Sequence, residues 1–258
     1  MEPVLFEIKN DIGFITLNRP EKFNAFNREM ALLFQSKLDR CAEDKNIRCV
    51  FITGNGKAFS AGQDLAEAAD PNGPSMKQIL SEHYNPIISR IRSLKKPVVA
   101  AVNGVAAGAA ANIAFCCDIV VASSSASFIQ AFSKIGLIPD SGGTFFLPRL
   151  IGWQKASALM MLGEKISSTD AEKMGMIYKV FEDEIFLNEA MKIAHTVASM
   201  PTQGLALTKE ALNKSFTNNT EQQLNVEDVL QRQASETFDY KEGVQAFLEK
   251  RKPVFKGE

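Results

Sequence analysis

The sequence is poor in the residues on which disulfide and zinc chemistry depend. Its four cysteines show neither a CxxC pair nor a zinc-type spacing. They are Cys41, Cys49, Cys116 and Cys117. Unpaired cysteines of this kind are typical of a reducing compartment. We therefore expect free thiols, a cytoplasmic location and no bound metal.

An excess of charge of one sign is also lacking. The 258 residues include 29 basic and 30 acidic side chains, which gives a net charge of −1. A balanced surface offers no general attraction for nucleic acid, so we do not expect a nucleic-acid partner. The N-terminus has no basic segment followed by an apolar one, and no apolar run is long enough to span a bilayer. We expect neither a signal peptide nor a membrane partner.

Several catalytic motifs are absent as well. No GxSxG elbow accompanies the two histidines, His83 and His195, whose polar neighbours predict a solvated surface position. Gly54-Asn55-Gly56 lacks the third glycine of a dinucleotide fingerprint, and there is no Walker A sequence. These absences argue against a serine hydrolase, a dinucleotide-binding enzyme and a P-loop NTPase.

The sequence does show an alternation of strands, glycine-containing turns and helices. Residues 3–9 and 13–17 predict a hairpin, and short apolar runs at 49–53 and 97–102 predict buried strands. Apolar residues at helical spacing predict a helix that follows Asn27 as its N-cap. This alternation predicts an α/β fold. The last third is mostly helical, with helices expected at 153–162, 169–175, 184–199, 201–215, 219–236 and 241–250.

One carboxylate, Asp140, stands in an apolar and glycine-rich stretch, FSKIGLIPDSGGTFFLP. A lone acid among apolar groups tends to have a raised pKa and to move protons. Five apolar side chains could form a dry wall around it: Phe132, Ile135, Ile138, Phe145 and Phe146. Pro-Asp-Ser-Gly-Gly is also a good turn, and Asp140 could be the N-cap of a helix that starts at Ser141. Taken alone, the stretch favours the cap.

Two turns upstream of Asp140 look alike, because each follows a buried strand and ends in small residues before a helix. They are Ser60-Ala61-Gly62-Gln63-Asp64 and Ala107-Gly108-Ala109-Ala110. Small side chains would expose backbone N–H groups at the helix starts. Two such groups aimed at one point form an oxyanion hole. Close helix packing also demands alanine and glycine, and for either turn alone it is the commoner cause.

Together these stretches resemble the crotonase family, also called the enoyl-CoA hydratase/isomerase superfamily. The matching motifs are Asn24-Ala25, AFSAGQDL, KPVVAAVNGVAAGAAANIAFCCDIVVAS, FSKIGLIPDSGGT and EGVQAFLEKRKPVF, in the order and at the spacing of the family. The resemblance covers essentially the whole chain. It implies a spiral of ββα units at 1–198, which carries the acyl-CoA site, and a helical oligomerisation region at 199–258. It further implies a homotrimer or a dimer of trimers, with an acyl-CoA thioester as substrate and no cofactor.

The resemblance also assigns residues to roles. The oxyanion donors fall on the backbone N–H groups of Gln63 and Ala109. Loops that face the CoA moiety fall on Lys22, Asn24, Ala25, Ala61, Asp64 and Leu65. Two tail residues, Phe247 and Lys250, match positions that contact CoA in relatives, sometimes from a neighbouring subunit.

Three positions depart from the pattern of the hydratases in this family. Asn112 and Phe132 stand where hydratases carry two glutamates that activate water, and neither side chain can exchange a proton in that role. Asp140 replaces the glycine that hydratases carry after the proline. An acid there is typical of members that isomerise or otherwise transform the acyl group, including dienoyl-CoA isomerases and a CoA-thioester dehalogenase. The sequence GLIPDSGGTFFLPRLIG is most similar to ring-epoxide isomerases of phenylacetate breakdown, which act on 1,2-epoxyphenylacetyl-CoA.

We therefore expect an acyl-CoA isomerase in which Asp140 transfers the proton. Three other functions stay open: a straight-chain enoyl-CoA isomerase, an enoyl-CoA hydratase, and a non-catalytic homologue that binds RNA. The balanced charge and the single acid in an apolar setting argue against the RNA-binding alternative.

Overall fold

A six-stranded sheet forms the centre of the molecule. The computed structural model describes residues 2–258. In spatial order the strands are β1 (Val4–Lys9), β2 (Ile12–Leu17), β3 (Cys49–Gly54), β5 (Val98–Val102), β7 (Ile119–Ser123) and β10 (Lys179–Phe181). β1 and β2 form the predicted antiparallel hairpin, and the other neighbouring pairs run parallel. β5 reads VVAAV and is buried throughout, as expected for a parallel strand that is covered on both faces.

A second sheet is built from four strands of three residues each. In spatial order they are β4 (Ala58–Ser60), β6 (Val105–Ala107), β8 (Ser127–Ile129) and β9 (Lys165–Ser167). β4, β6 and β8 each follow a strand of the first sheet and lead into a helical segment. These repeated strand–strand–helix units form a spiral, which confirms the predicted α/β fold of crotonase type.

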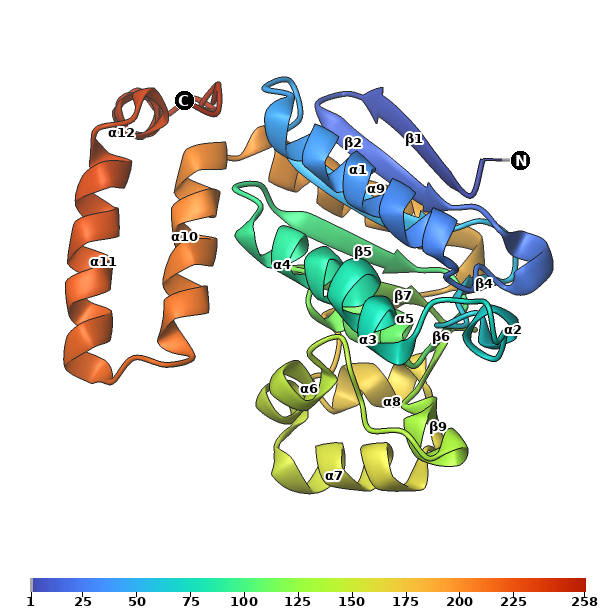
Figure 1. Ribbon diagram of the computed structural model, residues 1–258. Coiled ribbons are helices and arrows are strands. Elements are labelled where there is room, and N and C mark those ends of the chain that lie inside the picture. The colour runs from blue at the N-terminus through green and yellow to red at the C-terminus, as the bar shows by residue number, and fades with distance from the viewer. Residues whose placement is uncertain (1) are drawn as a thin grey trace.

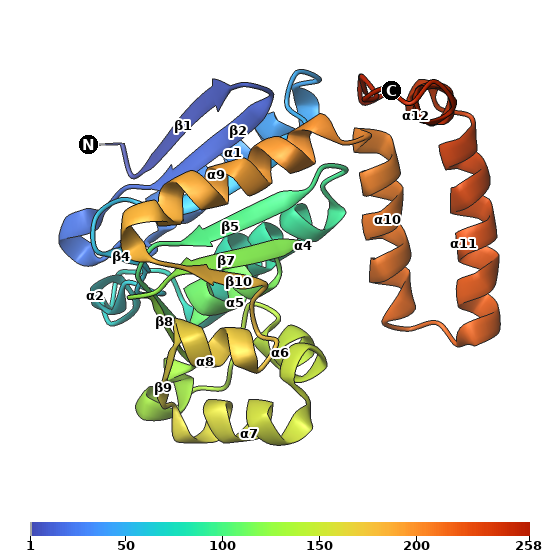
Figure 2. The same ribbon diagram turned by 180° about the vertical axis from the view of Figure 1, so that it is seen from behind.

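Helices cover both faces of the six-stranded sheet. α1 and α4 lie on one face and α9 on the other (Figures 1 and 2). α1 begins after Asn27, whose side chain accepts a hydrogen bond from the Met30 N–H (3.0 Å), so Asn27 is the predicted N-cap. The bounds of the first helices are η1 (Pro20–Lys22), α1 (Arg28–Glu43), α2 (Leu65–Ala68), α3 (Met76–Gln78), η2 (Ile79–Tyr84, a π-helix), α4 (Asn85–Ser93) and α5 (Ala109–Phe115). The others are η3 (Ala131–Ile135), α6 (Gly143–Ile151), α7 (Trp153–Leu162), α8 (Ser168–Lys173), α9 (Asp183–Ser199), α10 (Thr202–Ser215), α11 (Thr220–Ser235) and α12 (Phe238–Leu248).

The core has two parts, one on each side of the large sheet. The smaller part packs α9 against the sheet through residues spaced four apart, which place one face of the helix inward. These residues are Phe186, Ala190, Ala194 and Ala198. The larger part lies under α1, η2, α4 and α5 and reaches the small sheet. This larger part of the core therefore includes residues of β4, β6 and α5, the elements next to the two small-residue turns.

The last three helices project from the core as an arm (Figure 1). Lys209 of α10 fixes the arm through an ion pair of 2.7 Å between its Nζ and Asp118 Oδ2, with only 6% of its side chain exposed. The ring centroids of Phe216 and Phe145 lie 5.2 Å apart and join the far end of α10 to α6. The division of the chain at residue 198 stays a prediction. Within residues 2–258, no helix has the length and apolar content that crossing a membrane requires.

Candidate active site

The first small-residue turn connects β4 to α2. A parallel bridge between Phe26 and Gln63 holds it in place. In this bridge the Phe26 N–H donates to Gly62 O (2.7 Å), and the Asp64 N–H donates to Phe26 O (2.8 Å). Gln63 lies between the residues that form these two bonds, and its own N–H donates no hydrogen bond within residues 2–258.

The second turn connects β6 to α5. Gly108 has φ +54° and ψ −127°, a conformation that favours glycine, and α5 begins at the next residue, Ala109. The first N–H groups of a helix have no intrahelical acceptor. In the described part of the chain, the Ala109 N–H donates to no other group. Every residue of α5 is buried, so this donor lies in a medium of low dielectric constant.

The two turns are in contact. Gly62 has φ +87°, and a Cβ atom built on it would lie 2.7 Å from Ala107 O and 3.6 Å from Ala109 N. Only glycine permits so close an approach of the two backbones. The sequence-predicted donors, Gln63 and Ala109, are therefore brought together as free N–H groups on adjacent turns.

A buried tyrosine fixes the side chain of Gln63. Tyr84 ends the π-helix η2, is 1% exposed, and donates a hydrogen bond of 2.9 Å from its hydroxyl to Gln63 Oε1. Burial raises the pKa of the Tyr84 hydroxyl well above its ordinary value, and the charge of Asp140 raises it further. Sequence reasoning missed Tyr84. The signal was the interruption of the helical pattern near Pro86, because short π-helical segments often occur at functional sites.

Asp140 does not cap a helix. α6 begins at Gly143 and its N-cap is Gly142, without a side-chain hydrogen bond. Ser141 (φ 52°) and Gly142 (φ 73°) are both left-handed, so two non-helical residues separate Asp140 from the first turn. The Asp140 carboxylate accepts a hydrogen bond from the Ser141 hydroxyl (2.8 Å). Burial raises the pKa of Asp140, and this hydrogen bond opposes the rise without cancelling it.

Asn112 and Phe132 lie between the acid and the second turn. Asn112 is fully buried on α5, and its Nδ2 donates to the backbone oxygen of Asp140 (2.9 Å). Phe132 is buried, with its ring 3.7 Å from where a Cβ of Gly108 would stand. The two positions where hydratases carry glutamate are therefore a hydrogen-bonded amide and an apolar ring.

The expected dry wall around Asp140 is only partly present. Phe132 and Phe146 are buried, but Ile135 is half exposed and Ile138 is 80% exposed. Phe145 packs edge-on against Phe146 and Phe216, and Arg149 Cζ lies 3.9 Å from its ring centroid. The prediction of a five-residue wall is wrong for Ile135 and Ile138, because residues 135–138 are exposed on the single chain, and Phe145 on α6 is itself 37% exposed.

The loops expected to face CoA surround the first turn. Lys22, Ala61 and Leu65 are exposed, and Ala25 is buried. Asn24 is fully buried, and its Nδ2 donates to Asn55 O (2.9 Å) and Ala58 O (2.8 Å). Its backbone is also engaged, because the Asn24 N–H donates to Arg19 O (2.9 Å) and Asn24 O accepts from the Ser60 hydroxyl (2.7 Å). Asn24 therefore holds the loop in place.

The Asp64 side chain also forms bonds that stabilise the fold. Its carboxylate caps α2 by accepting from the Ala66 N–H (3.1 Å) and pairs with Arg19 Nη2 at 3.0 Å. Burial opposes ionisation, but these hydrogen bonds outweigh it and lower the pKa of Asp64. The residue stays ionised beside the turn.

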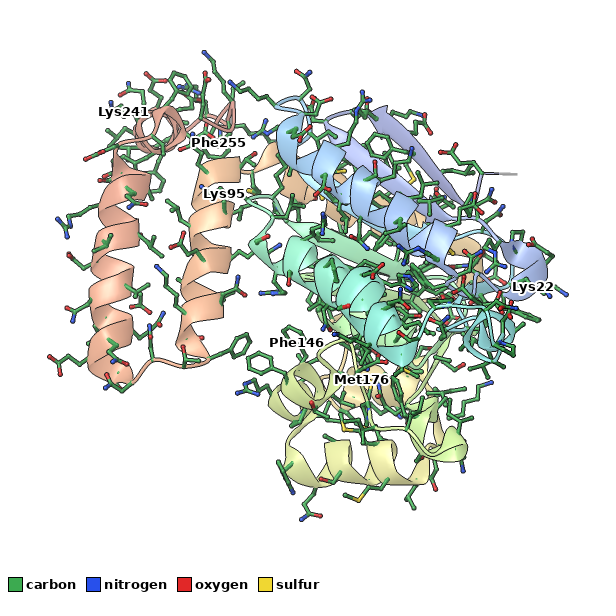
Figure 3. The ribbon with its side chains drawn as sticks, viewed as in Figure 1. Lys22, Lys95, Phe146, Met176, Lys241 and Phe255 are labelled. Carbon is green, nitrogen blue, oxygen red and sulfur yellow. The ribbon has the colours of Figure 1, made fainter. Side chains whose placement is uncertain are left out.

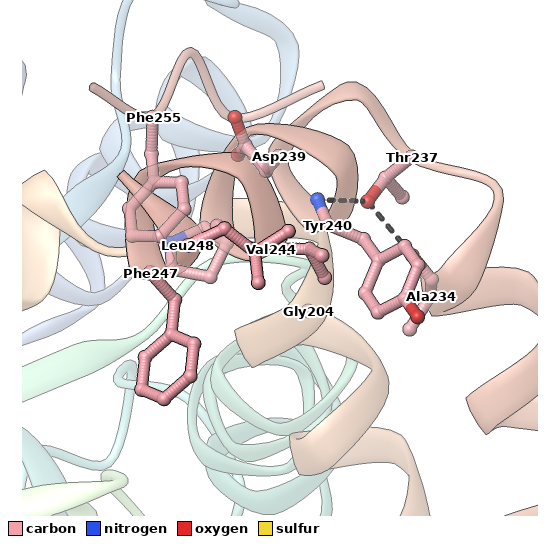
Figure 4. Close-up of a pocket in the computed structure, with 11 residues that line it drawn as sticks. Gly204, Ala234, Thr237, Asp239, Tyr240, Val244, Phe247, Leu248 and Phe255 are labelled. Atoms are coloured by element: carbon pink, nitrogen blue, oxygen red, sulfur yellow. Dashed lines mark hydrogen bonds between the residues drawn. The ribbon is translucent and has the colours of Figure 1, made fainter. Parts of the chain in front are cut away.

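The tail residues Phe247 and Lys250 do not reach this site within one chain. Phe247 lies at the end of α12 and Lys250 just after that helix, across the molecule from the turns (Figure 1). In Figure 3, Lys22 lies on the opposite side from Lys241 and Phe255. Phe247 is 82% exposed and borders an apolar hollow of about 420 Å³ between α10 and α12, shown in Figure 4. This hollow is separate from the oxyanion turns.

His83 is not on a solvated surface, contrary to the sequence expectation. It is 1% exposed in the π-helix, and Arg28 Nη1 lies 3.2 Å from its Nε2. Burial and the Arg28 charge lower the pKa of His83. Among the described residues, no three His, Cys, Asp or Glu side chains lie close enough together to bind a metal ion.

Comparison with known proteins supports the arrangement. The sequence matches the enoyl-CoA hydratase/isomerase family over residues 7–258. It is 45% identical over 260 residues to the 1,2-epoxyphenylacetyl-CoA isomerase of Escherichia coli K12, which spans 100% of this chain and 99% of the relative. It is 36% identical to the trans-2-decenoyl-[acyl-carrier-protein] isomerase of Streptococcus mutans, over 98% of both chains. The crystal structure of an enoyl-CoA hydratase from Bacillus anthracis superposes with a TM-score of 0.92 and 32% identity, covering 99% of this chain and 100% of the other.

Proposed function

Because the chain belongs to the enoyl-CoA hydratase/isomerase family, we propose that it isomerises an acyl-CoA thioester by a proton transfer through Asp140. The observation that carries the proposal is the pair of free N–H groups, Gln63 and Ala109, on touching turns, with the partly buried Asp140 joined to the same helix α5 through Asn112. The two donors bind the thioester oxygen, and the acid moves the proton.

The donors act on the charge that develops during the reaction. Removing a proton from carbon next to a thioester places negative charge on the carbonyl oxygen. Two preorganised N–H groups stabilise that oxyanion more than they stabilise the neutral carbonyl, and so lower the barrier. Removing one such donor in other enzymes costs about 10²–10³ in kcat.

Asp140 is suited to carry the proton. Its raised pKa makes the carboxylate a stronger base than an exposed aspartate. It takes a proton from one carbon of the substrate and returns it to another, so the mass of the substrate does not change. Asn112 and Phe132 offer no second acid or base, which disfavours the activation of water for hydration.

For the acyl group, we favour 1,2-epoxyphenylacetyl-CoA. The support is the 45% identity to the Escherichia coli isomerase of that substrate, together with the aromatic ring of Phe132 beside the second turn. With this substrate, the polarised thioester assists ring opening and rearrangement. A straight-chain enoyl-CoA isomerase is the second candidate, favoured by the similarity to the Streptococcus mutans isomerase.

The CoA moiety is proposed to lie against the loops that carry Lys22, Ala25, Ala61 and Leu65. Phe247 and Lys250 cannot join it from the same chain, because they lie at the far end of the arm. Their proposed contact with CoA therefore requires a neighbouring subunit, as in a trimer or a dimer of trimers.

The test is incubation with a panel of CoA thioesters, followed by mass spectrometry and absorbance. The panel contains 1,2-epoxyphenylacetyl-CoA, a straight-chain β,γ-unsaturated CoA ester and crotonyl-CoA. An isomerase gives products of unchanged mass from the first or the second ester. Addition of one water to crotonyl-CoA as the fastest reaction would identify a hydratase and contradict the proposal.

A further inference from the structure

One buried amide joins the oxyanion helix to both ends of the loop that carries Asp140. Asn112 lies one helical turn after Ala109 on α5 and is fully buried. Its Nδ2 donates to the backbone oxygen of Asp140 (2.9 Å), and its Oδ1 accepts from Gln130 Nε2 (2.7 Å). Gln130 directly precedes η3, and Asp140 ends the loop that follows it. The side chain thus spans the start and the end of the loop.

The start of α6 packs closely against this amide. A Cβ atom built on Gly143 would lie 2.3 Å from Asn112 Nδ2, so the backbone of α6 presses directly on the amide. The Asp140 oxygen also accepts from the Gly143 N–H (2.8 Å). The start of α6 and the end of the acid loop are therefore both held against Asn112.

We propose that Asn112 is a positioning residue, which sets where the Asp140 carboxylate stands relative to the Ala109 N–H. The inference rests on the proposed function, because it gives the rigid link a role in proton transfer. Asn112 does not touch the substrate in this account. It acts through the backbone of Asp140.

The choice of an amide follows from the two bonds. The position needs a donor toward Asp140 O and an acceptor toward Gln130 Nε2, and a neutral amide supplies both. A carboxylate at the same place could accept from Gln130 but could not donate to Asp140 O. An alkyl side chain would leave Gln130 Nε2 buried without its acceptor and would leave Asp140 O with the Gly143 N–H alone.

The consequence for catalysis is a matter of alignment. A base must stand within hydrogen-bond reach of the proton that it removes. A displacement of about 1 Å can cost about 10²-fold in rate. Loss of the amide should therefore lower kcat by about 10- to 100-fold, while KM changes little because the CoA loops are not altered.

The test compares Asn112→Leu, which keeps the branched skeleton of the side chain but replaces the amide by two methyl groups, with Gln130→Met, which removes one of the two bonds. Two quantities are measured on the full-length protein: kcat and KM with a CoA ester that the wild type isomerises, and hydrogen exchange of residues 130–142 by mass spectrometry. Asn213→Ala is the control. Asn213 lies on α10, outside the acid loop, and its amide likewise accepts one hydrogen bond, from Arg92 Nε (3.1 Å), and donates one, to Arg92 O (3.1 Å). This variant should change neither quantity.

We expect faster exchange in 130–142 and a lower kcat for Asn112→Leu, with a smaller effect of the same kind for Gln130→Met. If Asn112→Leu does not fold, Gln130→Met decides by the same two measurements. Wild-type exchange in 130–142, or a kcat within about threefold of wild type, would overturn the inference. A wild-type protein that isomerises no ester refutes the proposed function instead. Exchange in 130–142 then still reports whether Asn112 fixes the loop.

Discussion

Replacement of Asp140 by asparagine removes the proposed proton carrier while it keeps the shape of the side chain. Asparagine retains an oxygen that can accept the hydrogen bond from the Ser141 hydroxyl, now 2.8 Å from the carboxylate. It cannot take a proton from carbon. General acid–base catalysis is worth about 10²–10⁴-fold, so Asp140→Asn should lower kcat by that factor, or about 3–5 kcal/mol in the barrier.

The effect on stability has a definite sign. Burial raises the pKa of Asp140 above its ordinary value of 3.8, so the ionised carboxylate costs the folded state free energy. The stability that Asp140 contributes in its neutral form is fully present below pH 3.8 and is lost as pH rises through the folded pKa. Asp140→Asn should therefore melt at the same temperature as wild type or higher at pH 7. The difference should disappear in acid.

The assay is isomerisation of a β,γ-unsaturated CoA ester, followed by absorbance, beside thermal unfolding at pH 7 and pH 3.5. Asp228→Asn is the matched control, since Asp228 is exposed on α11 and pairs only with Arg232. Intact mass must exclude deamidation, which would regenerate the wild type. An Asp140→Asn protein with near-normal kcat would refute the catalytic assignment. A lower melting temperature at pH 7 would refute the account of its burial.

Four further outcomes are expected. Tyr84→Phe removes the hydroxyl that holds the Gln63 side chain, and kcat should fall about 3- to 10-fold with folding intact, given about 1 kcal/mol for a typical hydrogen bond; an unchanged kcat would separate Tyr84 from the oxyanion turn. Free acids should neither bind nor react, and turnover of a free acid with a kcat/KM like that of its CoA ester would contradict the need for CoA. Crotonyl-CoA should be hydrated far more slowly than a β,γ-unsaturated ester is isomerised, because Asn112 and Phe132 cannot activate water. Hydration faster than isomerisation would contradict this reading of the two positions. Removal of residues 237–258 should lower both assembly size in sedimentation and affinity for CoA, and retention of both would show that this segment serves neither.

The sequence predicts the long elements of the fold well. α1 and α9 carry repeated apolar faces over four turns, and β5 is a continuous apolar run, so periodicity identifies them. The small sheet is not predicted, because strands of three residues are too short to show alternation. The burial of His83 is missed for a related reason: its polar neighbours face solvent, while the histidine faces Arg28 and Gln35 of α1, a contact between distant segments.

The candidate site, like the fold, is predicted from the sequence only in part. The two small-residue turns are visible in the sequence, and the family resemblance implies that Gln63 and Ala109 are the oxyanion donors, which stays a prediction. The alternative role of Asp140 as a helix cap, which the stretch alone favours, is wrong, because the left-handed Ser141 and Gly142 delay the start of α6. Asn112 is recognisable only as a missing glutamate. Its bonds to residues 18 and 28 positions away depend on how the spiral stacks, which no local pattern encodes.

The central claim is that the Gln63 and Ala109 N–H groups bind a thioester oxygen within reach of Asp140. A crystal structure of the protein with an unreactive acyl-CoA analogue tests it most directly. The account predicts the carbonyl oxygen at about 2.7–3.1 Å from both backbone nitrogens, with the Asp140 carboxylate facing the neighbouring carbon. A carbonyl oxygen bound elsewhere, or an Asp140 carboxylate turned away from the acyl chain, would contradict it.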